Sequence, residues 1–152
     1  MTAKKVGMLA VALFLFRSGM LIADDQFEDF RYISDGTSII ITRYTGSATR
    51  VTIPTEINGL PVTTIGDEAF DGRIYLKSVT IPNSVTTIGE FAFYYCTNLT
   101  SVTISDSVTT IGDGAFKWCV SLTSVTIPDT ITTIGDSVFS TCTSLTNVTI
   151  GN

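Results

Sequence analysis

The sequence of 152 residues contains no histidine, and only 15% of its residues are charged. The absence of histidine excludes every catalytic or metal-binding arrangement that needs an imidazole, including the Ser-His-Asp and Cys-His types. Acidic residues outnumber basic ones by 14 to 9, and this charge disfavours nucleic acid and anionic membranes as partners. No G-x-S-x-G, P-loop or G-x-G-x-x-G motif occurs. The sequence therefore predicts a protein that is not an enzyme and that uses no cofactor.

Long hydrophobic runs are also lacking, except near the N-terminus. Lys4 and Lys5 precede an apolar run over residues 6–16, and Ala23 suits a cleavage site. This order is typical of a secretory signal peptide. A membrane-spanning helix needs about 20 apolar residues, and this run is shorter. We expect residues 1–23 to be a signal peptide and the mature chain to be secreted or held at the cell surface, with no membrane span. A buried N-terminal helix is the alternative.

What the sequence does contain is a repeat. Residues 76–98 agree with residues 99–121 at 14 of 23 positions, and residues 99–121 agree with residues 122–144 at 15 of 23. Residues 145–150 begin another copy, which stops inside the coil, and residues 51–66 carry the start of the same pattern with five extra residues. A fixed period of this length predicts coils that stack into a solenoid.

The apolar positions predict the path of each coil. Val79 and Ile81 alternate with hydroxyl residues, which is typical of a strand with one buried face. Gly89 is expected to allow a turn with positive φ. Ala92, Phe93 and Cys96 then follow at a spacing that favours one or two helical turns. The fold class predicted is an α/β solenoid of short parallel strands with short helical turns, in which Phe stacks on Phe from coil to coil.

The pattern L-x-S-V-T-I-P-x-S-V-T-x-I-G-x-x-A-F-x-x-C resembles the BspA-like leucine-rich repeat family, whose members are secreted or cell-surface proteins with 23-residue repeats. The resemblance covers residues 51–152 and implies a right-handed coil that acts in binding or adhesion. Residues 30–53 resemble the β-rich lead-in of such arrays, and we expect residues 24–50 to form a β-rich N-terminal cap. The chain departs from the pattern at Arg73, which replaces the cysteine, and at Val138, which replaces the alanine.

Two sets of residues are the candidate binding residues, and none is predicted to be catalytic or to bind metal. The first set should point off the exposed strand face as a regular grid: Ser78, Thr80, Ser101, Thr103, Ser124, Thr126, Asn147 and Thr149. The second set, Tyr94, Tyr95 and Trp118, precedes the cysteines at positions that vary between coils and should face solvent. The grid could instead reflect strand propensity and solubility, and the aromatics could cover the coil locally.

Two further columns have a structural and a functional interpretation. Cys96, Cys119 and Cys142 recur every 23 residues, and buried thiols are favoured over a disulfide because parallel side chains do not converge. Asp67, Glu90, Asp113 and Asp136 follow the repeat glycine. We favour helix N-capping for these four over a Ca²⁺ ladder, because one carboxylate per coil supplies too few ligands.

The leading functional hypothesis is an exported, non-catalytic protein that binds an extracellular protein or glycan through its strand face. The alternative is a structural repeat that self-associates, because Leu145, Val148 and Ile150 would leave an apolar edge after the last coil. A homo-oligomer formed through this C-terminal edge is the partner expected from that alternative.

Overall fold

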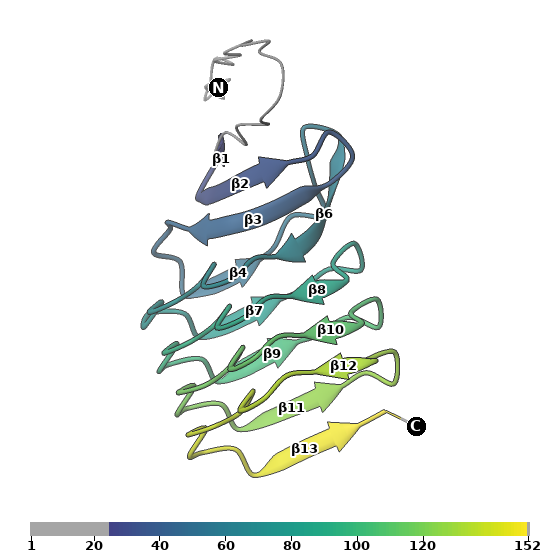
Figure 1. Cartoon of the computed structure of the whole chain (residues 1–152). Coiled ribbons are helices and arrows are strands. Elements are labelled where there is room, and N and C mark those ends of the chain that lie inside the picture. Colours follow the sequence, from purple (N-terminus) through teal and green to yellow (C-terminus); the bar gives the residue numbers. More distant parts are fainter. Residues whose placement is uncertain (1–24, 152) are drawn as a thin grey trace, which may run out of the picture.

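The computed structural model describes residues 25–151, so the predicted signal peptide lies outside the described residues. Strands from successive coils lie side by side in two sheets that run the length of the stack (Figure 1). The larger sheet has the order β1-β2-β3-β6-β8-β10-β12, and β5 pairs with β6. The smaller sheet has the order β13-β11-β9-β7-β4. The predicted solenoid is therefore confirmed.

The strands are two to six residues long, and each complete coil from residue 76 onward contributes one strand to each sheet. The larger sheet contains β1 (Asp25–Phe27), β2 (Phe30–Ser34), β3 (Ile39–Tyr44), β5 (Glu56–Ile57), β6 (Leu60–Ile65), β8 (Thr87–Ile88), β10 (Thr110–Ile111) and β12 (Thr133–Ile134). The smaller sheet contains β4 (Arg50–Thr52), β7 (Ser78–Thr80), β9 (Ser101–Thr103), β11 (Ser124–Ile127) and β13 (Asn147–Ile150). From β6 and β4 onward, neighbouring strands pair in parallel with equivalent residues opposite one another.

The core consists of columns of identical side chains. Phe93 is fully buried and stacks on Phe70 and Phe116, with ring centroids 4.8 and 5.1 Å away. Phe139 continues the column, 5.6 Å from Phe116. This confirms the expectation that Phe stacks on Phe. Since no coil encloses its own ring, each coil depends on its neighbours for burial.

The predicted short helical turns are absent from the described residues, in which no helix is formed. The backbone between the two sheets follows consecutive turns instead. The amide of Phe93 donates to the carbonyl oxygen of Ala115 in the next coil at 2.8 Å. The amide of Phe70 donates in the same way to the carbonyl oxygen of Ala92 at 2.7 Å. A helix would have used these amides within the coil. We call this side of the solenoid, residues 66–76 and their equivalents in later coils, the turn edge.

Residues at the N-terminal end of the stack fold as antiparallel strands that continue the larger sheet. β1, β2 and β3 pair antiparallel, and β3 then pairs in parallel with β6 of the first coil. Tyr44, at the end of β3, stacks on Phe70 with centroids 5.1 Å apart, and Phe30 packs against Tyr44 at 5.2 Å. These two rings cover the first phenylalanine of the column, which would otherwise face solvent.

Candidate binding surfaces

The smaller sheet places the predicted hydroxyl grid on one exposed surface, which we call the hydroxyl face. Its register sets Ser78 beside Ser101 and Thr80 beside Thr103. Ser124 follows beside Ser101, and β13 then sets Asn147 beside Ser124 and Thr149 beside Thr126. All eight predicted residues are exposed except Ser78, which is half-buried. Among residues 25–151, these eight side chains make no hydrogen bond to another part of the protein. Their donors and acceptors are therefore available to a partner.

Other threonines, which the sequence alone did not distinguish from these, have a structural role. The hydroxyl of Thr109 donates to the backbone oxygen of Thr86 at 3.3 Å. In the same way, the hydroxyl of Thr123 donates to the backbone oxygen of Thr100 at 3.4 Å. The same bond repeats at Thr86, Thr100, Thr132 and Thr146. Each of these hydroxyls joins one coil to the preceding coil, so the chain contains two classes of threonine.

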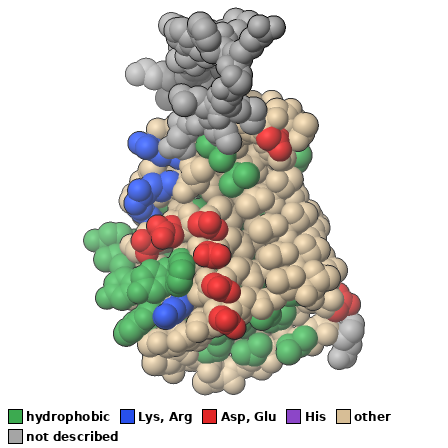
Figure 2. Space-filling view, in the orientation of Figure 1, with side chains coloured by type: hydrophobic (Ala, Val, Ile, Leu, Met, Phe, Trp, Pro, Cys, Tyr) green, Lys and Arg blue, Asp and Glu red, His purple; other side chains and the backbone are tan. Residues whose placement is uncertain are grey.

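The predicted aromatic residues lie on the turn edge and not on the hydroxyl face. Tyr95 and Trp118 are exposed, with ring centroids 6.1 Å apart, and Tyr94 is half-buried beside Tyr95. Figure 2 shows hydrophobic side chains gathered at this edge next to carboxylates. The candidate residues therefore form two surfaces, which come from different segments of each coil.

The three cysteines are buried and free, as the sequence favoured. Each thiol donates to a backbone oxygen; the Cys96 thiol contacts the Phe70 oxygen at 3.1 Å and the Cys119 thiol contacts the Phe93 oxygen at 3.2 Å. Burial raises the pKa of Cys96 to about 12 and also raises the pKa values of Cys119 and Cys142. Thiols held in the neutral form are poor nucleophiles, which fits a packing role.

Two carboxylates of the predicted acidic column accept hydrogen bonds from backbone amides, but these amides belong to the next coil. Asp67 Oδ1 accepts from the amide of Glu90 at 2.8 Å, and Asp113 Oδ1 accepts from the amide of Asp136 at 2.7 Å. The helix N-capping interpretation was wrong, because no helix follows these residues in the described part of the chain. In residues 25–151, no group of three or more Cys, Asp or Glu side chains is placed to hold a metal ion.

The repeat glycine is required for a different reason from the one expected. Gly89 does not have a positive φ. A Cβ at Gly89 would lie 2.8 Å from the backbone nitrogen of Asp67, which is closer than real Cβ contacts. Close stacking of the coils, and not turn geometry, therefore excludes a side chain at this position.

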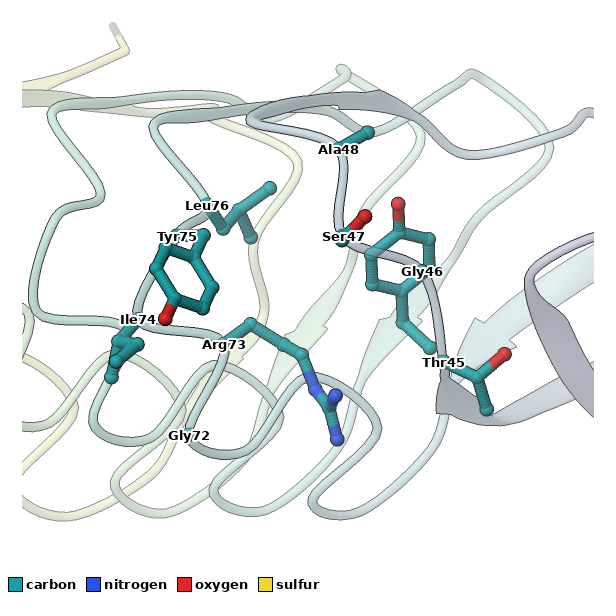
Figure 3. A pocket seen from close by; sticks show the side chains of 10 residues that line it. Thr45, Gly46, Ser47, Ala48, Gly72, Arg73, Ile74, Tyr75 and Leu76 are labelled. Atoms are coloured by element: carbon teal, nitrogen blue, oxygen red, sulfur yellow. The ribbon is translucent and has the colours of Figure 1, made fainter.

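A separate cleft of about 390 Å³ lies where the N-terminal strands meet the first coil. Arg73 lines it together with Ser47 and Tyr75 (Figure 3). Arg73 occupies the position that cysteine holds in later coils, and its Nε is buried with no hydrogen-bond partner among residues 25–151. The guanidinium and the neighbouring hydroxyls offer hydrogen-bond donors and acceptors to a polar ligand.

The last coil exposes apolar side chains. Ile134, Val148 and Ile150 have exposed fractions of 51%, 47% and 70%. They line a cleft together with half-buried Phe139, the end of the aromatic column. Among residues 25–151, no helix is long and apolar enough to cross a bilayer.

The fold and these surfaces define a repeat protein built as a solenoid that offers extended faces. The model described as "BspA type Leucine rich repeat region (6 copies)" matches residues 43–152. The chain therefore belongs to the BspA-type leucine-rich repeat family, as the repeat pattern implied. No curated protein matches the chain.

Solved structures of bacterial leucine-rich repeat proteins are similar to the chain. One from Bacteroides capillosus has a TM-score of 0.75 and 28% identity, over 84% of this chain and 98% of that one. One from T. pallidum has a TM-score of 0.66 and 27% identity, over 84% of this chain and 82% of that one. A leucine rich cell surface protein from Faecalibacterium prausnitzii has a TM-score of 0.63 and 34% identity, over 83% of this chain and 42% of that one.

Proposed function

We propose that this protein is exported, acts outside the cell or at its surface without catalysis, and binds an extracellular protein or glycan through the hydroxyl face. The observation that carries the proposal is the set of exposed hydroxyl side chains that make no bond to the rest of residues 25–151. Residues two apart on a strand are separated by about 6.6 Å and neighbouring strands by about 4.8 Å. Such a grid suits a partner that presents many donors and acceptors at once.

The location proposed follows from the basic and apolar order of residues 1–23 and from family membership. A similar solved protein is described as a cell surface protein. Expression of the full-length gene with a C-terminal tag tests the location. Recovery of a mature chain that begins near residue 24 outside the cytoplasm is expected, and recovery of the uncleaved chain in the cytoplasm would contradict it.

Binding through the hydroxyl face is tested with a matched pair of triple variants. The first replaces Thr80, Thr103 and Thr126 with alanine. The control replaces Thr87, Thr110 and Thr133, which lie in the larger sheet of the same coils, with alanine. The probes are a glycan array and a panel of purified extracellular proteins. The first variant should lose at least about tenfold in affinity for the ligand found, which corresponds to about 1.4 kcal/mol, and the control should bind as the unchanged chain does. Equal losses in both variants would contradict the proposal.

A second candidate function is self-association through the last coil. Ile134, Val148 and Ile150 are large, apolar and exposed on one end of the solenoid, and exposed apolar surface with a free strand edge favours association. Analytical ultracentrifugation should then detect a dimer that Ile150→Asp dissociates. A monomer at concentrations of tens of micromolar would exclude this candidate.

A further inference from the structure

The turn edge carries a continuous row of aromatic rings. Phe91 contacts Tyr94 with centroids 5.6 Å apart, Tyr94 contacts Tyr95 at 6.1 Å, and Tyr95 contacts Trp118 at 6.1 Å. Tyr95 and Trp118 are exposed by 46% and 39%. Contiguous exposed aromatic surface of this kind marks sites of contact with a partner.

The backbone under three of these rings is in a conformation that large side chains rarely adopt. The φ angles of Phe91, Tyr95 and Trp118 are 50°, 56° and 65°. The equivalent positions of other coils also have positive φ, and they carry Gly72, Gly114, Glu68, Ser137 and Thr141. Folding alone is served best by glycine at such positions. The chain nevertheless holds large aromatic residues at three of these positions, in two neighbouring coils.

A cleft of about 370 Å³ opens beside this row, lined by Glu68, Asp71, Phe91, Tyr94 and Lys117. The rings of Phe91 and Tyr94 meet at 87° and so form two perpendicular walls. Asp71, Tyr94 and Lys117 are equivalent residues of three successive coils. The cleft therefore has carboxylates at one end, aromatic rings in the middle and a lysine at the other end. Within the described chain, no salt bridge neutralises these three charged groups.

The chemistry of the cleft favours a guanidinium. Ring faces attract a cation placed over them, and this attraction grows when the cation is removed from water. Carboxylates bind a guanidinium through charge-assisted, paired hydrogen bonds, and a guanidinium also stacks on rings better than an ammonium does. A sugar ring is fitted less well, because the neighbouring rings of the row are tilted by 38° and 48° and offer no flat platform.

We propose that this cleft binds an arginine side chain of an extended segment of a partner protein, with Glu68 and Asp71 pairing with the guanidinium and Phe91 and Tyr94 flanking it. Tyr95 and Trp118 then contact the neighbouring residues of the segment. This site is separate from the hydroxyl face and does not depend on the function proposed for that face. Lys117 limits the affinity, because its positive charge faces the same cleft.

The test uses a hexa-arginine peptide with blocked ends, titrated into the full-length protein by calorimetry. Glu68→Gln with Asp71→Asn should weaken binding at least tenfold. The control, Asp106→Asn with Asp129→Asn, changes the net charge equally at exposed positions elsewhere and should weaken binding less than twofold. Tyr94→Leu should weaken binding about fivefold. Lys117→Met should strengthen binding at least twofold.

Two further readouts locate the ligand and identify its class. Trp118 is the only tryptophan of the chain, so binding at this edge should change the intrinsic fluorescence. A hexa-lysine peptide should bind at least threefold more weakly than hexa-arginine. Circular dichroism spectra of all variants should match that of the unchanged protein.

Equal losses in the two charge-matched double variants would overturn the proposal, since binding would then follow net charge alone. An unchanged affinity in Tyr94→Leu would overturn it as well. Binding of uncharged oligosaccharides that Tyr94→Leu abolishes would replace it with a sugar site.

Discussion

Removal of one ring from the middle of the aromatic column tests how the solenoid is stabilised. Phe93 is fully buried and stacks on Phe70 and Phe116 from the coils on either side. Replacing a buried phenylalanine with alanine typically costs about 3–5 kcal/mol, and each aromatic pair adds about 0.5–1.5 kcal/mol beyond burial. Because two pairs are lost at once, we expect Phe93→Ala to cost about 4–8 kcal/mol. Since 1 kcal/mol shifts Tm by about 2–4 °C in a chain of this size, Tm should fall by roughly 10 °C or more.

Phe139→Ala is the matched control for this prediction. Phe139 occupies the same column, but it is half-buried and, within residues 25–151, stacks on Phe116 alone, at 5.6 Å. Its replacement removes one pair and less buried surface, so we expect a cost of about 1–3 kcal/mol. Urea unfolding followed by far-ultraviolet circular dichroism measures both costs. If the two variants lose the same free energy of unfolding, a ring stacked on both sides is no more stabilising than a ring at the end of the column, and the prediction is refuted.

Three further predictions concern the contacts between coils. Gly114→Ala should cost at least about 1–2 kcal/mol, because Gly114 has a φ of 58° and a Cβ there would lie 2.5 Å from the Phe91 ring; a thermal melt unchanged from that of the parent would contradict this. Thr109→Val should lower the free energy of unfolding by about 0.5–1.5 kcal/mol, because it removes the hydrogen bond from the hydroxyl to the backbone oxygen of Thr86. Thr103→Val, on the hydroxyl face, should change it by almost nothing. Urea unfolding midpoints of the two variants test the difference. Burial raises the pKa of the Cys96 thiol from 9.0 to about 12. The folded state therefore holds the thiol proton more tightly than the unfolded state does. The stabilisation that results is fully present below pH 9 and falls as the pH rises from 9 towards 12. The Tm of the parent protein should therefore fall between pH 8 and pH 10.5, and Cys96→Ala should make this fall smaller. The same dependence of Tm on pH in both proteins would show that the Cys96 thiol does not cause it.

The repeat made much of the molecule predictable from sequence. A strict 23-residue period forces equivalent residues into register, so Phe93, Cys96 and Thr80 each predict the environment of their equivalents in the next coil. The alternation of Val79 and Ile81 with hydroxyl residues predicted which face of the strand is buried, and both apolar residues are buried. For these residues, local pattern and tertiary contact agree.

The turn edge could not be predicted in this way. The spacing of Ala92, Phe93 and Cys96 fits a helical turn within one coil. Once coils stack, however, the amide of Phe93 finds the Ala115 oxygen of the next coil. The same stacking explains why Gly89 must lack a side chain although its φ is ordinary. A pattern read along one coil does not contain the competing partner, which lies 22 residues further along the chain.

The sequence by itself determined the period, the buried columns and the exposed grid of hydroxyl side chains, because these depend on the order of residues within one coil and on its repetition. Only the tertiary structure decided which threonines bond between coils, that Tyr44 covers the start of the phenylalanine column, and that the aromatic residues form a cleft with Glu68 and Asp71 away from the hydroxyl face. These arrangements join side chains of different coils, and their geometry is set by the stacking distance and by the path of the backbone between the sheets.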